Sequence, residues 1–419
     1  MTRLPLDGIL VADFTRVLAG PLCTQLLADE GARVIKVEDP AAGDETRRWG
    51  PPFLGDFSTY FLSVNRNKES LALDLRTDEG KALAKELIAR ADVVVDNFLP
   101  SQREALLEVP EEKIHCSITG YDADTPEANR PGYDLLSQAG GGLMAITGAP
   151  DGEPMKTGVA LTDVLTAHYA HGAILAALYA REKTGRGQRL EVSLFSATVA
   201  SLVNVAQGAL ATGQEARRYG NAHPSIVPYQ VFQAADRAFA MGGATDRHYR
   251  LLCTRVLERP ELATDERFAT NRARVTNRAL LVPILEELFR ERTAEEWVQR
   301  CLDANIPSSL VQGVLEALRG ETAKPLIATA GEYEFVRHPV RFDGDRLPVR
   351  SLPPRLGEHT AALRRELGAC ATERTDGVAV RAPAEQAAPP AVPLTVGEQQ
   401  QAAADGEDER HQPHHETEV

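Results

Sequence analysis

The sequence predicts an α/β protein with two domains: a large domain built on a doubly wound, mostly parallel sheet, and a smaller α+β domain. Short apolar runs alternate with helical patterns over the first hundred residues, as in strand–helix–strand units. After about residue 205, a proline-punctuated connector leads into a charged helical stretch. A chain of 419 residues that is 43% hydrophobic is also long enough for more than one domain.

The elements of the large domain are predicted in chain order. Residues 8–14 (GILVADF) are a short apolar run, residues 22–30 form a helical pattern closed by Gly31, and residues 32–38 (ARVIKVE) are a second apolar run. Such a unit gives parallel strands joined by a right-handed crossover. The pattern continues with a strand at 70–76, a helix at 78–91, strands at 92–98, 113–120 and 188–195, and a helical run at 196–213. A ligand is expected at the carboxyl ends of these strands.

Composition also predicts the domain boundaries. We assign the large domain to residues 1–205, a connector to 206–230, the small domain to 231–320, and a segment returning to the large domain to 321–368. Beyond this segment the chain is rich in Ala, Pro, Gln and acidic residues, and so little apolar surface does not offset the entropy of ordering. Residues 369–419 are therefore predicted to be a disordered acidic tail.

Charge and composition exclude several classes of function. A formal net charge of -14 argues against a nucleic-acid binder, which needs a basic face. No apolar stretch approaches the length of a membrane span and no secretory cleavage site is evident, so we expect a cytoplasmic protein without a membrane partner. The five cysteines are scattered without a close pair, so we expect no metal site. The first strand is followed by one glycine where a dinucleotide fingerprint needs three, which disfavours NAD or FAD.

Two features carry candidate chemistry. Asp163 stands at the start of a long helical pattern, where a carboxylate is a favoured N-cap, typically worth about 1 kcal/mol. The same position at a positive helix end also suits an ionised nucleophile. Gly140, Gly141 and Gly142 are consecutive, which allows either tight packing or close approach of the backbone to a ligand. The residues alone do not decide whether Asp163 is an N-cap or a nucleophile, or whether the glycines serve packing or ligand binding.

Six blocks of the sequence together resemble the class III CoA-transferases of the CaiB/BaiF type. This family includes formyl-CoA and carnitine CoA-transferases and the related α-methylacyl-CoA racemases. The blocks lie in the family's order over about residues 4–368, and their combination is specific although each alone is weak. They are LDGILVADFTRVLAGPLCTQLLADEGARVIKVEDP, NRNKESLALDLRTDEGKALAKELI, ADVVVDNFLP, RPGYDLLSQAGGGLMAITG, LTDVLTAHYAHGAILAALYAREKTGRGQ and PPRLGEHT.

The resemblance implies an enzyme that transfers CoA from an acyl-CoA thioester to an acceptor carboxylic acid. In similar enzymes the residue matching Asp163 attacks the thioester, and mixed-anhydride and aspartyl-CoA intermediates follow. The three glycines would lie near the thioester and stabilise an oxyanion. Coenzyme A would be a substrate and not a permanently bound cofactor. The positions that match the family's CoA contacts are Arg16, Val17, Ala19, Leu73, Arg76, Asn97 and Phe98, with Arg103 as a candidate phosphate contact.

The resemblance also implies an interlocked homodimer, and a second glycine pair, Gly242 and Gly243, that covers the site. The partners expected are an acyl-CoA and a small carboxylic acid. Short dicarboxylates and hydroxy acids are candidate acceptors, with Arg16 or Arg47 pairing with a second carboxylate. The sequence does not identify the donor or acceptor acid.

The chain departs from the family's pattern at two places. The stretch between Asn97 and Tyr133 is shorter than usual, and Ser101 stands where the family commonly has glycine, which puts the reach of Arg103 in question. Tyr133 replaces a histidine that racemases use in proton transfer, and a tyrosine with a pKa of about 10 is a poor substitute. This favours transfer over the two alternatives, an acyl-CoA racemase or epimerase and a non-catalytic CoA-binding protein of the same fold.

Overall fold

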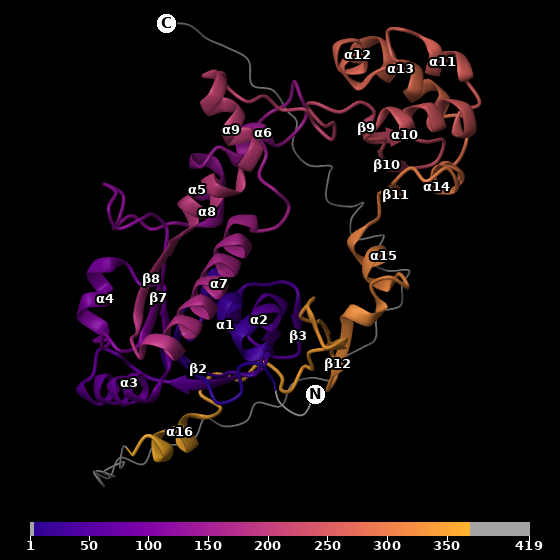
Figure 1. Ribbon diagram of the computed structural model, residues 1–419. Helices are drawn as coiled ribbons and strands as arrows, with labels where there is room; N and C mark the ends of the chain where they lie inside the picture. The colour runs from indigo at the N-terminus through magenta and orange to yellow at the C-terminus, as the bar shows by residue number, and fades with distance from the viewer. Residues whose placement is uncertain (1–3, 369–419) are drawn as a thin grey trace, which may run out of the picture. The chain divides into compact units, whose positions relative to one another are not determined.

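A computed structural model describes residues 4–368, and the predicted tail at 369–419 lies outside the described residues. Its largest sheet has six strands in the order β5-β2-β1-β6-β7-β8, and every neighbouring pair is parallel (Figure 1). The strands are β1 (Leu10–Phe14), β2 (Arg33–Glu38), β5 (Lys68–Ala72), β6 (Val93–Asp96), β7 (Ile114–Thr119) and β8 (Gln188–Ser193). The predicted α/β class and parallel sheet are confirmed.

Helices cover both faces of this sheet, which is why its central strands are apolar runs instead of alternating patterns. On one face, α1 (Ala19–Asp29) and α7 (Leu161–Thr184) pack side by side against β1, β2, β6 and β7 (Figure 1). On the other face, α3 (Asp78–Arg90) and α16 (Thr360–Glu366) contribute to a second apolar cluster. The sheet is therefore doubly wound.

The strand order reverses direction between β1 and β6. From β1 the chain continues through α1 to β2 on one side, whereas β6 and β7 lie on the other side. Loops leaving the carboxyl ends of two such strands diverge and open a crevice, which is where α/β sheets bind ligands. Residues 15–18 follow β1 and residues 97–99 follow β6, so these two loops border the crevice.

The helical run predicted at 196–213 differs from the structure. It is two helices, α8 (Leu194–Ser201) and α9 (Val203–Thr212), which meet at an angle of 76°. The segment without helix or strand is 213–228, shorter than the predicted connector because α9 continues to Thr212. Among the described residues, no single helix has the length and apolar character needed to cross a membrane, although α8 and α9 meet that criterion when taken as one bent pair.

The last described segment covers the edge strand of the sheet. The His359 backbone N–H donates to the Ser70 carbonyl at 3.1 Å, and the Thr360 hydroxyl oxygen accepts the Ala72 N–H at 2.9 Å. These bonds satisfy backbone groups of β5 that would otherwise be an open edge. Upstream, Tyr333 of β13 (Tyr333–Val336) lies in an apolar cluster with Phe61. The return segment therefore packs on residues of the large domain.

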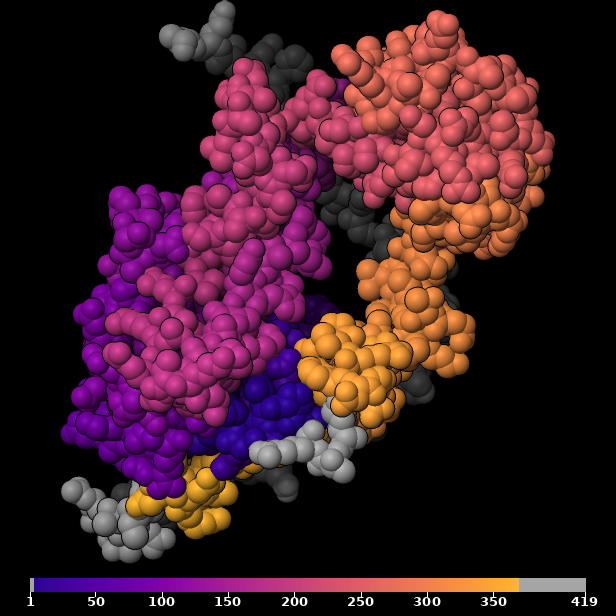
Figure 2. Space-filling model, viewed as in Figure 1, coloured from indigo at the N-terminus to yellow at the C-terminus, as the bar shows by residue number. Residues whose placement is uncertain are grey.

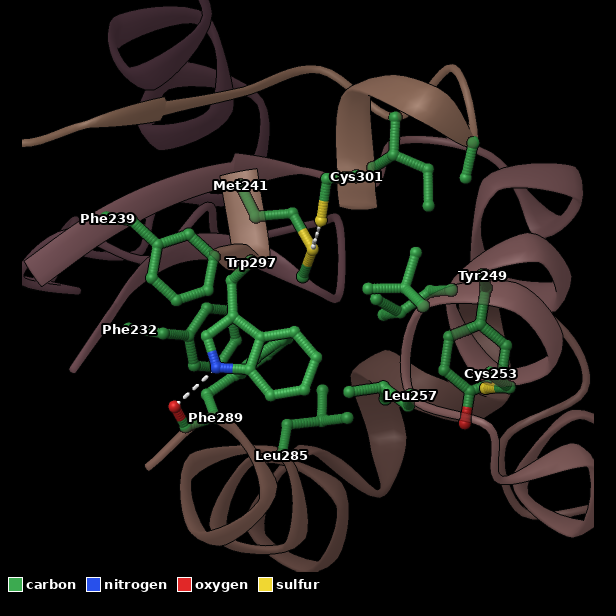
Figure 3. Packing of buried hydrophobic residues seen from close by; sticks show 14 of the residues in the cluster. Phe232, Phe239, Met241, Tyr249, Cys253, Leu257, Leu285, Phe289, Trp297 and Cys301 are labelled. Atoms are coloured by element: carbon green, nitrogen blue, oxygen red, sulfur yellow. Dashed lines mark hydrogen bonds between the residues drawn. The ribbon is translucent and has the colours of Figure 1, made fainter. Parts of the chain in front are cut away.

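A second apolar core lies in the α+β part of the chain, around the antiparallel strands β9 (Tyr229–Gln233), β10 (Ala238–Gly242) and β11 (Ser308–Leu310). Figure 3 shows its aromatic centre, where Phe289 lies 4.8 Å from Phe232 and 5.2 Å from Trp297 between ring centroids. The Trp297 indole N–H donates to the Phe289 carbonyl at 2.7 Å. The helices of this part are α10 (Asp246–Leu251), α11 (Pro260–Thr264), α12 (Asn271–Thr276), α13 (Arg278–Phe289) and α14 (Ala294–Asp303).

Arg274 is a fully buried cation within this second part. Its guanidinium donates to the carbonyls of Val227 and Phe268 at 2.6 and 2.9 Å and to the Asp246 carboxylate at 2.8 Å. It also lies over the Tyr249 ring, 4.4 Å from the centroid. One side chain therefore joins the end of the connector to two helical segments.

Replacing Arg274 with Met should lower the free energy of unfolding of this part by about 3 kcal/mol, because two buried carbonyls and a carboxylate lose their donor. Trp297 fluorescence in a Trp49→Phe background, followed through a urea titration, measures the change. Arg272→Met, on an exposed residue of the same helix, is the matched control. Equal midpoints for the two variants would contradict the structural role of Arg274.

Candidate active site

Two adjoining cavities occupy the crevice at the carboxyl ends of the strands. The first, of about 220 Å³, contains Asp163. The second, of about 500 Å³, extends toward the end of β5. Arg16, Phe98 and Gln102 line both cavities, so the two form one continuous site. The site has room for an extended ligand whose one end reaches Asp163.

Asp163 is not the N-cap that one interpretation of the sequence predicted. The N-cap of α7 is Ala160, and Asp163 is the third residue of the helix. Its carboxylate accepts the backbone N–H of Ala19, the first residue of α1. Since the first N–H groups of a helix have no partner inside the helix, α1 stabilises an anion at this point. The carboxylate therefore contacts the amino end of one helix while belonging to the first turn of another.

The surroundings of Asp163 raise the pKa of its carboxyl well above the usual value for aspartate. Burial raises the pKa, the negative charge of Asp134 raises it further, and the Ala19 N–H lowers it, which leaves a pKa of about 7. Asp134 is fixed because it accepts the backbone N–H and the hydroxyl of Thr162 at 3.0 and 2.7 Å. A carboxyl so tuned is a candidate nucleophile or base.

Tyr60 is a neighbour that the sequence did not reveal. Burial raises its pKa to about 12, and the negative charges of Asp163, Asp134 and Asp44 contribute. Its ring lies edge-on to that of Trp49, 5.0 Å between centroids. The stretch RRWGPPF that precedes Tyr60 carries no catalytic pattern, so only the fold shows that this residue is electrostatically coupled to the site.

The loop after β1 is fixed to the loop after β6 by a reciprocal pair of hydrogen bonds. The Arg16 N–H donates to the Asn97 side-chain oxygen at 3.1 Å, and the Asn97 amide donates to the Arg16 carbonyl at 2.8 Å. The Arg16 guanidinium lies over the Phe98 ring at 6.0 Å. Val17 has φ +73°, an unusual conformation for a β-branched residue. Together with Ala19, these predicted CoA-contact residues line the first cavity.

Leu73 and Arg76 line the second cavity with Arg16 and Phe98. The Arg76 side chain is exposed and donates to Asp74 at 2.8 Å. Its guanidinium is therefore close to the cavity and free to reorient toward an anionic ligand at small cost, because exposed ion pairs are weak. The structure thus brings seven of the eight predicted CoA-contact residues to one continuous site.

Arg103 is the exception, and its predicted phosphate contact is not supported. It lines neither cavity and is buried with its Nε 3.4 Å from the Asp96 carboxylate. Asp96 also accepts the Ser117 hydroxyl at 2.9 Å and contacts the His115 ring nitrogen at 2.7 Å. The short segment after β6 places Arg103 inside α4 (Pro100–Leu106), facing the sheet and not the ligand crevice.

The three consecutive glycines lie outside both cavities, and the middle one is tightly packed. They lie where α5 (Asp134–Gly140) passes into α6 (Leu143–Ile146). A Cβ on Gly141 would lie 2.6 Å from the Thr198 methyl group of α8, and Gly142 has φ +85°. Tight packing therefore accounts for Gly141 and a left-handed backbone for Gly142, and the oxyanion role of the run stays a prediction. Gly242 lies in β10, in the second part of the chain.

Other residues of the first cavity were not predicted. The backbones of Gly120 and Gly132 are in close contact, since a Cβ on Gly120 would be 2.6 Å from the Gly132 backbone. This close approach brings Tyr133 beside the end of β7, where its exposed ring lines the cavity. The paired glycines at the ends of the 120–132 loop were the available signal. Further lining residues are Leu18, Glu45, Leu99, Gln102, Ile118, Thr119, Pro131 and Leu194.

Comparisons with known proteins agree with this geometry. The family model for CoA-transferase family III matches residues 6–360. Human succinyl-CoA:glutarate CoA-transferase is 40% identical over 381 residues, covering 87% of this chain and 86% of that protein. The acetyl-CoA:oxalate CoA-transferase of Acetobacter aceti is 38% identical over 376 residues, covering 87% and 96%. A crystal structure of a CAIB/BAIF family protein from Brucella suis superposes with a TM-score of 0.79 at 40% identity, covering 87% of this chain and all of that one.

The family model spans nearly the whole described chain, and these relatives match it over most of their own length. The likeness includes both the parallel sheet with its site and the smaller α+β part, because the solved structure is covered completely. The chain belongs to CoA-transferase family III and is an enzyme that transfers CoA between an acyl-CoA and a carboxylic acid.

Proposed function

We propose that the reaction proceeds through covalent intermediates on Asp163. The carboxylate oxygen attacks the thioester carbonyl, which forms a mixed anhydride and releases the CoA thiolate. The thiolate then attacks the aspartyl carbonyl, which releases the donor acid and leaves an aspartyl-CoA thioester. The acceptor carboxylate then attacks the aspartyl-CoA thioester, which forms a second mixed anhydride and releases the CoA thiolate. The thiolate attacks the acceptor's carbonyl, so the new acyl-CoA leaves and the Asp163 carboxylate is regenerated. The observation that carries this proposal is a carboxylate of raised pKa inside the cavity at the amino end of α1.

Two features of the site support the nucleophilic role. The Ala19 N–H stabilises the ionised form of Asp163, so the carboxylate is available at neutral pH. Burial and Asp134 oppose that ionisation, and a carboxylate with a higher pKa is a better nucleophile than a fully solvated one. The combination gives a population of reactive anion near pH 7 without a separate general base.

The nucleotide of CoA fits the second cavity and its pantetheine arm fits the first. Arg16 stands at the junction of the two, and Arg76 stands at the far cavity. Guanidinium groups at these places suit the phosphates of CoA. The arm would pass Phe98, whose ring lines both cavities, and bring the thioester to Asp163.

Short dicarboxylic acids are the proposed acceptors. The relatives named above act on succinyl-CoA and glutarate or on acetyl-CoA and oxalate. The first cavity is small, and among the described residues Arg16 is its one cationic lining side chain. Tyr133 lines the same cavity, in the place where the family's racemases have a histidine for proton transfer, which favours transfer over racemisation. We further assign the enzyme to the CaiB/BaiF type, acting in the cytoplasm.

A homodimer accounts for the exposed apolar side chains of α7 and α9. Tyr179 is 64% exposed, Val203 is 70% exposed and Leu210 is 80% exposed. None of the side chains of α9 is buried within the chain, and Figure 2 shows the α9 segment at the surface. Exposed large apolar side chains of this kind are typical of an interface, and a second copy of the chain is the partner we propose.

Light scattering of the purified protein should give a mass near twice 45.5 kDa. Leu210→Asp should shift that mass toward the monomer, because a charge in an apolar interface loses its hydration. Thr212→Asp, two residues further along the same helix, is the control. A monomeric parent protein would contradict the assembly.

Replacing Asp163 with Asn should abolish transfer, because an amide oxygen of the same shape does not form the anhydride. The rate should fall by at least about 10³-fold, as expected for loss of a nucleophile. CoA binding measured by calorimetry should stay within a few-fold of the parent. Hydroxylamine should convert Asp163 of the parent, during turnover, to a hydroxamate detectable by peptide mass spectrometry. Full activity of the Asn variant would refute the mechanism.

The pH profile of kcat/KM should rise with pH through about 7, since that parameter reports the free enzyme and protonated Asp163 is not nucleophilic. Asp134→Asn removes the like charge, so the pKa of Asp163 falls and the acid limb moves to lower pH. Asp78→Asn, on an exposed residue of α3, is the control and should leave the limb in place. An unmoved limb in the Asp134 variant would contradict the electrostatic coupling.

A further inference from the structure

Two buried ammonium groups lie beneath the loop that follows β1. Lys36 on β2 and Lys68 on β5 are 0% exposed at their side chains, and each contacts a buried carboxylate. Lysines are almost never fully buried unless they are paired, because removing an ammonium group from water costs on the order of several kcal/mol. Neither side chain lines the two cavities of the active site. Their role is therefore separate from direct contact with CoA.

Lys36 contacts the start of the loop at residues 15–21 in two ways. Its ammonium donates to the Thr15 carbonyl at 2.7 Å and lies 2.9 Å from the Asp44 carboxylate. The other oxygen of Asp44 accepts the Val17 backbone N–H at 3.3 Å. Lys36 therefore holds Thr15 directly and Val17 through Asp44.

Lys68 binds the other end of the same loop. Its ammonium donates to the Pro21 carbonyl at 2.8 Å and to the Asn65 side-chain oxygen at 3.0 Å. It also lies 3.2 Å from the Asp13 carboxylate, which accepts the backbone N–H and the hydroxyl of Thr15 at 2.9 and 2.6 Å. The two lysines thus bind the carbonyls on either side of residues 16–20.

Between the Thr15 and Pro21 carbonyls, the backbone has a strained conformation at Val17. Val17 has φ +73°, and a β-branched residue in that region costs of order 1–3 kcal/mol. Such a conformation persists only where the surrounding contacts impose it. Replacing a buried ion pair by apolar residues often leaves stability unchanged or raises it. Stability alone therefore does not account for two buried lysines at this place.

We propose that Lys36 and Lys68 are positioning residues, which fix the Thr15–Pro21 segment so that the Ala19 N–H points at the Asp163 carboxylate. The inference rests on the proposed function of Asp163 as the nucleophile. The two lysines contact no reacting atom, and they act through the backbone that carries Ala19. Because Arg16 and Val17 lie in the same segment, the lysines also set the first contacts to CoA.

Loss of this support has a defined electrostatic consequence. The Ala19 N–H is the group that lowers the pKa of Asp163 against burial and Asp134. Tyr60 and the cavity residues Glu45, Arg16 and Tyr133 are the other charged or titratable groups near that carboxyl. When the loop relaxes, Asp163 loses its donor and is protonated over a wider pH range. The acid limb of the pH profile then moves to higher pH, opposite to the effect of removing Asp134.

The test compares Lys36→Met and Lys68→Met with Lys85→Met, a control on an exposed lysine of α3 paired with Glu108. In the first two variants, kcat at pH 7 should fall about 10- to 100-fold, as expected for misplaced catalytic groups. The acid limb of kcat/KM should move to higher pH, and KM for acyl-CoA should rise. Lys36→Arg, which keeps the charge, should recover part of the activity. The control should match the parent in every parameter.

Asp44→Asn gives a second route to the same loop, because it removes the charge that pairs with Lys36 without removing volume. It should change kcat and the acid limb in the same direction. Folded lysine variants with the parent's kcat and acid limb would overturn the proposal. Loss of the parent's circular dichroism in Lys36→Met, Lys68→Met and Asp44→Asn alike would also overturn it, since the network would then support the fold and not the site. If Asp163→Asn is inactive while the lysine variants are unaffected, only this inference fails; an active Asp163→Asn removes the proposed function itself.

Discussion

The hydrogen bond from the Ala19 N–H to Asp163 joins the two helices on which the site depends. α1 begins at Ala19 and α7 begins two residues before Asp163, so their first turns meet at one carboxylate. The amino ends of both helices favour negative charge there. Burial and the charge of Asp134 disfavour the ionised form, and the balance leaves Asp163 with a pKa of about 7. The covalent mechanism proposed for Asp163 depends on this balance.

Much of this arrangement could be predicted from the sequence, because it follows from local patterns. The apolar runs at 8–14, 32–38 and 92–98 require strands buried on both faces, and the helical patterns between them require parallel connections. Once these strands are placed, the residues after β1 and β6 must share an edge of the sheet. That rule predicts that Arg16 and Asn97 lie close together. The resemblance to a known family then singled out Asp163.

The remainder depended on contacts that sequence spacing does not encode. Whether Asp163 is an N-cap or the third residue of its helix is decided by a shift of three residues at the helix start. Arg103 turned inward because the segment after β6 forms a short helix against the sheet, where Asp96 compensates its charge. Gly141 likewise packs closely against Thr198 of α8, a contact that the spacing of the three glycines does not reveal. In each case the competing interpretations differ by a rotation or a small displacement, which only tertiary packing resolves.

The lysines beneath the loop show why a small site needs a large supporting network. A single N–H placed within hydrogen-bond distance of Asp163 requires the backbone of residues 15–21 to adopt one conformation, including φ +73° at Val17. Apolar packing is nondirectional and does not select a backbone conformation of this kind by itself. Ammonium groups that bind two carbonyls are directional, and burial strengthens them because water does not compete. In the proposed mechanism, the cost of burying Lys36 and Lys68 is offset by the precise placement of the N–H that faces Asp163.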